Sequence, residues 1–109
     1  MQAPMTSTAQ RLTQLAVLYQ KGQASELMDR TLEKLLALET QQSSDQLAEL
    51  QADLVEFEKR YQMTSTDFYA RYQTGETDDR MDYVEWASLV QMADNLRKRV
   101  VLLTGEDQP

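Results

Sequence analysis

The chain gathers many of its chemically capable side chains in one short acidic stretch. Carboxylates spaced three residues apart on a helix can bind Mg²⁺ or Ca²⁺ when a second helix supplies further oxygens. The same residues can instead cap a helix and compensate the positive end of its dipole, which requires no ion. We prefer the second interpretation and expect no metal site. The carboxylates of this stretch are Glu76, Asp78, Asp79, Asp82 and Glu85.

A second acidic pair gives the metal hypothesis its most specific form. Asp53 and Glu56 repeat the D-x-x-E spacing of Asp82 and Glu85. This repeat resembles the paired motifs with which all-helical nucleotide pyrophosphohydrolases hold magnesium. A magnesium-dependent nucleotide hydrolase is therefore the third and lowest-ranked hypothesis for this chain.

The residue types that are missing exclude most enzyme chemistry. The 109 residues include no cysteine and no histidine. Their absence removes disulfides, thiolate and Ser-His nucleophiles, the usual zinc ligand sets and the commonest general base near neutral pH. We therefore expect no enzymatic activity and no cofactor, and the lack of cysteine fits a reducing compartment.

The charge of the chain favours a basic protein as its partner. The net charge is −7, whereas binding to a phosphate backbone depends on Lys and Arg that displace counterions. The basic cluster Arg97, Lys98 and Arg99 is interpreted as a complement to the C-terminal dipole of a helix. We expect no nucleic-acid binding by this chain alone. The longest apolar run near the start, residues 15–19, is too short to cross a membrane, so we expect a cytoplasmic protein.

Composition and residue spacing predict an all-α fold. Gly and Pro are scarce, and Gly22, Gly75 and Gly105 each follow a helix-like run, where a residue able to adopt a positive φ favours helix termination. The first helix is expected over residues 7–21, because Ser7 and Gln10 have the spacing of a capping box. A short strand over residues 15–19 is the alternative.

The second helix is expected to begin after Ser25, a plausible N-cap, with Glu26 and Arg30 as an i,i+4 ion pair. Residues 40–46 are wholly polar, and the apolar positions on either side of them are out of phase. Two interpretations follow. Either the helix breaks there and a new one is capped by Ser43 and Gln46, or one long helix passes through a stutter.

Two heptad patterns predict an antiparallel coiled-coil hairpin with additional short helices. In the last helix, which should be capped by Asp78 or Asp79 and end near Leu103, two lines of residues repeat every seven positions. A short helix over residues 65–74, capped by Thr64, should join the heptad segments and make them antiparallel. Residues 1–24 would form an N-terminal helix or arm, and residues 25–109 the hairpin domain. The heptad positions are Leu47, Leu50, Leu54, Phe57 and Tyr61 in the first segment, and Trp86, Leu89, Ala93, Leu96, Val100 and Leu103 in the second.

Aromatic residues supply the candidate binding surface. Seven of them lie between residues 57 and 86, more than one helical seam can bury, and Tyr and Trp are favoured interface anchors. We expect Phe57, Phe68 and Trp86 in the core. The expected partner-binding residues, at least partly exposed, are Tyr69, Arg71, Tyr72 and Tyr83 with the acidic residues Glu76, Asp79 and Glu85.

Residues 57–92 also contain a distinctive pattern of aromatic and acidic residues. It consists of a Tyr, a Met followed by a cap, Phe-Tyr-x-x-Tyr, Gly-Glu, an Asp pair and Asp-aromatic-x-Glu-Trp, and in this chain it runs from Tyr61 to Trp86. This pattern resembles that of a group of short bacterial proteins, seen especially in cyanobacteria, that look like antitoxin components paired with a small toxin. The resemblance covers about a third of the chain and implies a small basic toxin as partner.

Three hypotheses follow, in order of preference. The first is a protein-interaction module of the antitoxin type. The second is a structural homo-oligomer, for example a homodimer, in which the helix of residues 25–61 and the last helix pair between chains. The third is the magnesium-dependent hydrolase.

Overall fold

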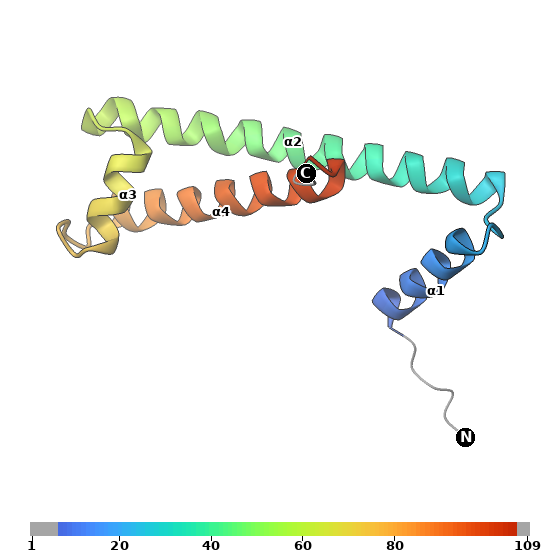
Figure 1. Cartoon of the computed structure of the whole chain (residues 1–109). Coiled ribbons are helices and arrows are strands. Elements are labelled where there is room, and N and C mark those ends of the chain that lie inside the picture. The colour runs from blue at the N-terminus through green and yellow to red at the C-terminus, as the bar shows by residue number, and fades with distance from the viewer. Residues whose placement is uncertain (1–6, 107–109) are drawn as a thin grey trace, which may run out of the picture. The chain divides into compact units, whose positions relative to one another are not determined.

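The chain is all-α, as predicted. The structure, a computed structural model, describes residues 7–106, so residues 1–6 of the predicted arm and residues 107–109 of the predicted hairpin domain lie outside it. The described chain folds into two compact units, residues 7–35 and 36–106, and the second helix contributes to both. The helices are α1 (Thr8–Gln20), α2 (Glu26–Tyr61), α3 (Ser65–Gln73) and α4 (Met81–Thr104), as labelled in Figure 1.

Local signals place the ends of α1. The predicted capping box is confirmed: the Ser7 hydroxyl accepts from the Gln10 amide, and the Gln10 side chain accepts from the Ser7 amide. The helix ends at Lys21, and Gly22 adopts a φ of 71° that allows the chain to turn. The alternative of a strand over residues 15–19 is therefore wrong.

One continuous helix, α2, passes through the polar segment 40–46, which decides between the two interpretations of that segment. Ser25 caps its start as predicted, because the hydroxyl accepts from the Met28 amide at 3.1 Å. The predicted ion pair between Glu26 and Arg30 is present at 2.6 Å. Ser43, predicted as a possible cap, is a helix-interior residue that is buried on the side facing α4 and accepts from Arg99 Nε at 3.0 Å.

The hairpin consists of α2 and α4, which run antiparallel and side by side in Figure 1. Every predicted heptad residue on the two helices is buried or half-buried, so the seam is confirmed. Away from the turn, Arg99 extends the contact by binding both Ser43 and the Glu39 carboxylate. The hairpin is thus closed by apolar packing along the seam and by a polar contact at residues 39–43.

The helix α3 lies across the closed end of the hairpin (Figure 1). Thr64 caps it as predicted, since its hydroxyl accepts from the Asp67 amide. The Glu58 carboxylate of α2 accepts from the Ser65 amide at 2.7 Å and so satisfies another free amide of the first turn. Gln62 is the residue that turns the chain sharply between α2 and α3, and its φ of 54° is unusual for a residue other than glycine.

The core lies where the three helices of the second unit meet. Phe57, Phe68 and Trp86 are buried, as predicted, and Trp86 is completely inaccessible to solvent. The Trp86 indole lies parallel to the Phe68 ring at 3.9 Å and stacks on Phe57 at 5.6 Å, and its Nε1 donates to Ser65 Oγ at 2.9 Å. One side chain thereby joins all three helices.

Two expectations about α4 are wrong. Its N-cap is Arg80, which makes no side-chain capping hydrogen bond, rather than Asp78 or Asp79. The basic cluster 97–99 also lies before the last turn of α4, which contains no basic residue. Lys98 instead pairs with Asp94 on the same helix, and Arg99 reaches across to α2. Contacts between side chains therefore explain Lys98 and Arg99 better than the helix dipole does.

Within residues 7–106, none of the helices combines the length and the apolar character needed to cross a bilayer.

Replacing Trp86 by Ala should lower the free energy of unfolding by about 3–5 kcal/mol, because the cavity would be flanked by two rings that cannot both move to fill it. Urea unfolding followed by circular dichroism measures the change. Val84→Ala, an exposed position on the same helix, is the matched control and should change stability by less than about 0.5 kcal/mol. Equal effects of the two substitutions would contradict the central role of Trp86.

Replacing Gln62 by Gly should raise the free energy of unfolding by about 0.5–1 kcal/mol, because glycine adopts the left-handed conformation without a steric cost. Gln51→Gly, at an exposed position inside α2, should lower it by about 1 kcal/mol. Opposite signs for the two changes in the same unfolding assay would support the assignment, and a loss of stability in both would refute it.

Candidate protein-interaction site

The candidate site is built on seven aromatic residues, here called the aromatic cap, at the closed end of the hairpin. Its members come from three helices, so only the tertiary fold brings them together. The two residues of α2 pack against α4, and α3 covers the remaining side of the Trp86 ring. The members of the aromatic cap are Phe57, Tyr61, Phe68, Tyr69, Tyr72, Tyr83 and Trp86.

Two of the predicted partner-binding residues lie directly over the buried part of the cap. The rings of Tyr72 and Tyr83 are 5.6 Å and 5.3 Å from the Phe68 ring, measured between centroids. Both tyrosines are half-buried, so each is packed on one side and accessible on the other. Tyr83 contacts the cap more extensively, because it also packs on Tyr61 at 5.1 Å and near Trp86.

Tyr69 is also half-buried and lies on α3 one turn before Tyr72, with a ring separation of 6.5 Å. Its hydroxyl accepts a hydrogen bond from the Gln91 side chain of α4 at 2.8 Å. It borders a groove of about 380 Å³ between α3 and α4, whose other lining residues are Leu54, Ser65, Thr66, Val90, Gln91, Ala93, Asp94 and Arg97.

The remaining predicted residues are all exposed, but they do not form one surface. Arg71, Glu76 and Asp79 lie on α3 and on the loop that follows it, near the half-buried tyrosines. Glu85 lies two residues after Tyr83 on α4, a rotation of about 200° around the helix. Because Tyr83 faces α3, the structure separates Glu85 from the tyrosines.

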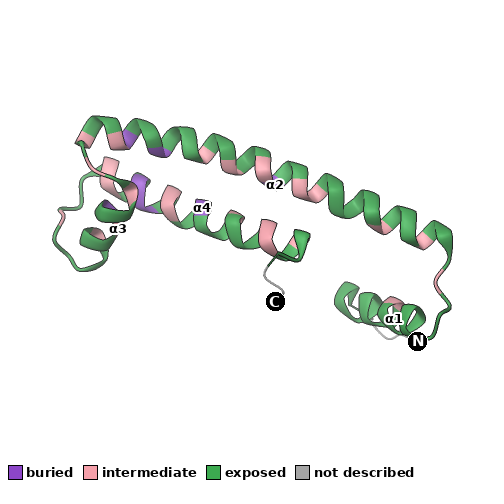
Figure 2. Ribbon diagram, turned by 45° about the horizontal axis from the view of Figure 1, so that its top comes forward, coloured by how far each residue is buried: buried purple, intermediate pink, exposed green. Residues whose placement is uncertain are grey.

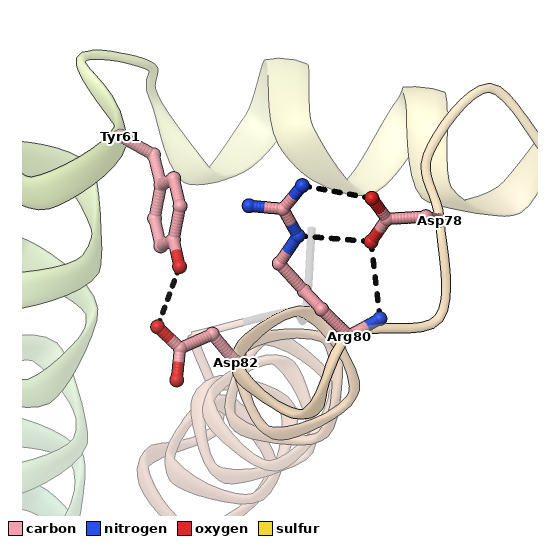
Figure 3. A network of polar contacts seen from close by, with 4 residues as sticks. All are labelled: Tyr61, Asp78, Arg80 and Asp82. Atoms are coloured by element: carbon pink, nitrogen blue, oxygen red, sulfur yellow. Dashed lines mark hydrogen bonds and ion pairs between the residues drawn. The ribbon is translucent and has the colours of Figure 1, made fainter.

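An arginine that the sequence analysis did not select organises the loop. Arg80 binds the Asp78 carboxylate through Nε at 2.9 Å and through an Nη nitrogen at 2.8 Å, and its amide donates to the same carboxylate (Figure 3). Its guanidinium group lies over the Tyr83 ring at 4.5 Å and 6.0 Å from the centre of the Tyr61 ring. This arrangement lowers the pKa of Asp78 to about 2, mainly through the hydrogen bonds from the Arg80 side chain.

Asp82 forms a second polar contact between α4 and the end of α2. Its carboxylate accepts from the Tyr61 hydroxyl at 2.5 Å, shown in Figure 3, and from Arg60 at 2.9 Å. These two hydrogen bonds lower the pKa of Asp82, and the bond from Tyr61 has the larger effect. The same contact with Asp82 raises the pKa of the Tyr61 phenol.

Short-range sequence signals could have identified part of this network. An Asp two residues before an amide that needs an acceptor is typical of an Asx turn, and Arg80 and Tyr83 have the i,i+3 spacing of helix neighbours. No local signal relates Tyr61 to Asp82, because the two residues are 21 positions apart and meet only in the folded hairpin.

The acidic residues do not converge on one point. Among residues 7–106, no group of three or more Asp, Glu, His or Cys side chains is close enough to hold a metal ion. Asp78 and Asp82 are engaged with Arg80, Tyr61 and Arg60, whereas Asp79 and Glu85 make no ion pair or hydrogen bond through their side chains within the same residues. The free carboxylates therefore face solvent as individual charges.

Comparisons with known proteins add no relative: no protein-family model matches the chain, and neither a curated protein nor a solved structure shows significant similarity to it.

Replacing Asp82 by Asn should lower the free energy of unfolding at pH 7 and weaken its pH dependence in acid. A carboxylate whose pKa is lowered by folding stabilises the native state above its unfolded pKa of 3.8, and this contribution is lost as the pH falls through the folded pKa. The difference between wild type and variant should therefore be largest above pH 5 and shrink below pH 4. Urea unfolding at pH 7 and pH 3 measures it.

Asp79→Asn is the matched control for this experiment, because it removes one carboxylate from the same region that has no partner within residues 7–106. It should leave stability nearly unchanged at both pH values. A pH-independent difference between wild type and Asp82→Asn would contradict the proposed role of the Tyr61–Asp82 contact.

Proposed function

We propose that this chain is a protein-interaction module that binds a small basic protein, as the antitoxin component of a toxin–antitoxin pair. The observation that carries the proposal is the aromatic cap. Half-exposed tyrosines are held on a fully packed aromatic core, next to acidic residues that face solvent. Such a surface has the rigid anchors and the charge that recognition of a basic protein requires.

Rigidity is the first argument. The Tyr72 and Tyr83 rings are backed by Phe68, of which only 1% is exposed, so their conformations are largely set before a partner arrives. Pre-ordered aromatic side chains lose little conformational entropy on binding and still bury a large apolar area. The Arg80 guanidinium also packs on the Tyr83 ring, 4.5 Å from its centre, which limits the motion of the ring further.

Charge is the second argument. Residues 36–106 contain fourteen acidic and seven basic residues, a net charge of −7. The acidic loop after α3 adds Glu76 and Asp79 beside the tyrosines, and both are exposed. An acidic surface speeds association with a basic partner and makes that association dependent on salt.

The groove beside Tyr69 is the third argument. Its volume of about 380 Å³ lies within the range of pockets that hold a small ligand or a side chain. Its lining combines apolar residues such as Leu54 and Val90 with the opposite charges of Asp94 and Arg97, and Asp94 is also paired with Lys98. We assign it to an apolar anchoring side chain of the partner.

The partner should be isolated by affinity capture of the tagged chain from cells of its source and identified by mass spectrometry. We expect a small basic protein in equimolar amount. Producing that protein alone should arrest growth, and producing this chain with it should restore growth. Capture of no basic protein, or of one whose production is harmless, would overturn the proposal.

With the partner in hand, Glu76→Lys combined with Asp79→Lys should weaken binding about 10- to 100-fold, mainly through slower association, and reduce its dependence on salt. The matched control is Asp45→Lys with Glu49→Lys, which changes the net charge equally at exposed positions of α2. Surface plasmon resonance at two salt concentrations measures both. Equal losses would show that only the overall charge matters.

Tyr72→Ala tests the anchors more cleanly than the same change at Tyr83. Tyr83 contacts three other members of the cap and Arg80, so its loss would also weaken the fold. Tyr72, in contrast, packs only on Phe68 and Tyr69 among the described aromatic residues. Tyr72→Ala should reduce affinity at least 10-fold while the helix content measured by circular dichroism stays unchanged. Loss of helix would show that Tyr72 is a core residue.

A further inference from the structure

Residues 7–35 form a helical hairpin that lacks a core of its own. It consists of α1, the turn at Gly22 and the first ten residues of α2. None of its side chains is buried, as Figure 2 shows by the absence of purple on these segments. Only Leu15, Ala24, Met28 and Leu32 are half-buried.

The uncovered side chains of this hairpin are apolar and regularly spaced. On α1, Leu12 and Leu18 lie three residues before and after Leu15, and so flank it on one face. On α2, Leu35 lies three residues after Leu32 in the same way. The exposed fractions are 51% for Leu12, 40% for Leu18 and 49% for Leu35, and Leu27 is 73% exposed.

The two segments belong to one compact unit. At their junction, the Asp29 carboxylate of α2 lies close enough to the Tyr19 phenol of α1 to raise its pKa. On α1 the exposed Leu12 and Leu18 lie about 60° to either side of the half-buried Leu15, so the apolar stripe is about 120° wide. Apolar stripes of this width are typical of helices that bury one face in a bundle.

Two helical segments as short as those of residues 7–35 gain stability when their apolar faces are buried. Isolated helices as short as α1, with 13 residues, are marginal in water. Domains below about 40 residues generally need disulfides, metals or association with another chain to be stable, and this chain has no cysteine. A second layer of apolar side chains would add to the stability that residues 26–35 gain from belonging to the long helix α2.

The distribution of charge over residues 7–35 indicates which partner provides the second apolar layer. Residues 7–35 contain four basic and three acidic residues, a net charge of +1, so two copies repel each other only weakly, in contrast to residues 36–106 with a net charge of −7. Within the hairpin the charges are also segregated. Residues 7–21 contain Arg11 and Lys21 and no acidic residue, whereas residues 26–35 contain three acidic and two basic residues.

We propose that residues 7–35 are a dimerisation module, in which the hairpins of two copies of this chain form a four-helix bundle with α1 of one copy against α2 of the other. This pairing places the basic helix of each copy beside the acidic helix segment of its partner. It is isologous, so it closes with two subunits. The interface uses residues other than those of the aromatic cap, so each copy keeps its own partner-binding residues.

Light scattering of the full chain after size exclusion tests the proposal. The expected mass is twice the 12.6 kDa of one chain. Leu18→Asp and Leu35→Asp should each raise the dimer dissociation constant at least about 100-fold, because a carboxylate would be buried in the bundle. Both positions are exposed in the single chain, so the α-helical circular dichroism of residues 36–106 should persist.

Leu102→Asp is the matched control, since Leu102 is 71% exposed on α4 and lies outside residues 7–35. It should leave the dimer intact. A monomeric wild-type chain at about 100 µM, a dimer that survives Leu18→Asp and Leu35→Asp, or a dimer broken by Leu102→Asp would each overturn the proposal. None of these outcomes bears on capture of the basic partner, so the two proposals fail separately.

Discussion

The second unit depends on the burial of one indole ring. Trp86 stacks between Phe68 of α3 and Phe57 of α2, and its single polar group is satisfied by Ser65. Burying such a large side chain without a partner for its N–H would be costly, so the position of the α3 N-terminus and the orientation of Trp86 are linked. The Glu58 carboxylate, which accepts from the Ser65 amide, ties α2 to the same point.

The surrounding tyrosines and charged residues pack around this buried core. Tyr72 and Tyr83 pack on Phe68, and Arg80 packs on the Tyr83 ring while it forms an ion pair with Asp78. The Arg80 guanidinium also lies near the Tyr61 ring, and the Tyr61 hydroxyl donates a hydrogen bond to Asp82. The loop of residues 74–80 is therefore ordered by one bidentate ion pair and two ring contacts rather than by an apolar core.

The two units carry different chemistry. Residues 36–106 combine a packed aromatic core with a strong negative charge, which suits recognition of a basic protein. Residues 7–35 are nearly neutral and expose leucines at helical spacing, which suits association between like surfaces. The proposed antitoxin-type protein, with two copies of its binding surface in a dimer, would combine both properties.

The sequence by itself determined the helices, their N-caps at Ser7, Ser25 and Thr64, the glycine stops and the heptad seam, because each depends on residues within about one or two turns of each other. It also identified the three core aromatic residues. Only the tertiary structure decided that α2 continues through residues 40–46, where Arg99 binds Ser43 from α4. It likewise decided the start of α4 at Arg80, the Tyr61–Asp82 contact and the separation of Glu85 from the tyrosines. These features depend on groups brought together from distant parts of the chain, and their energies are absent from any local pattern.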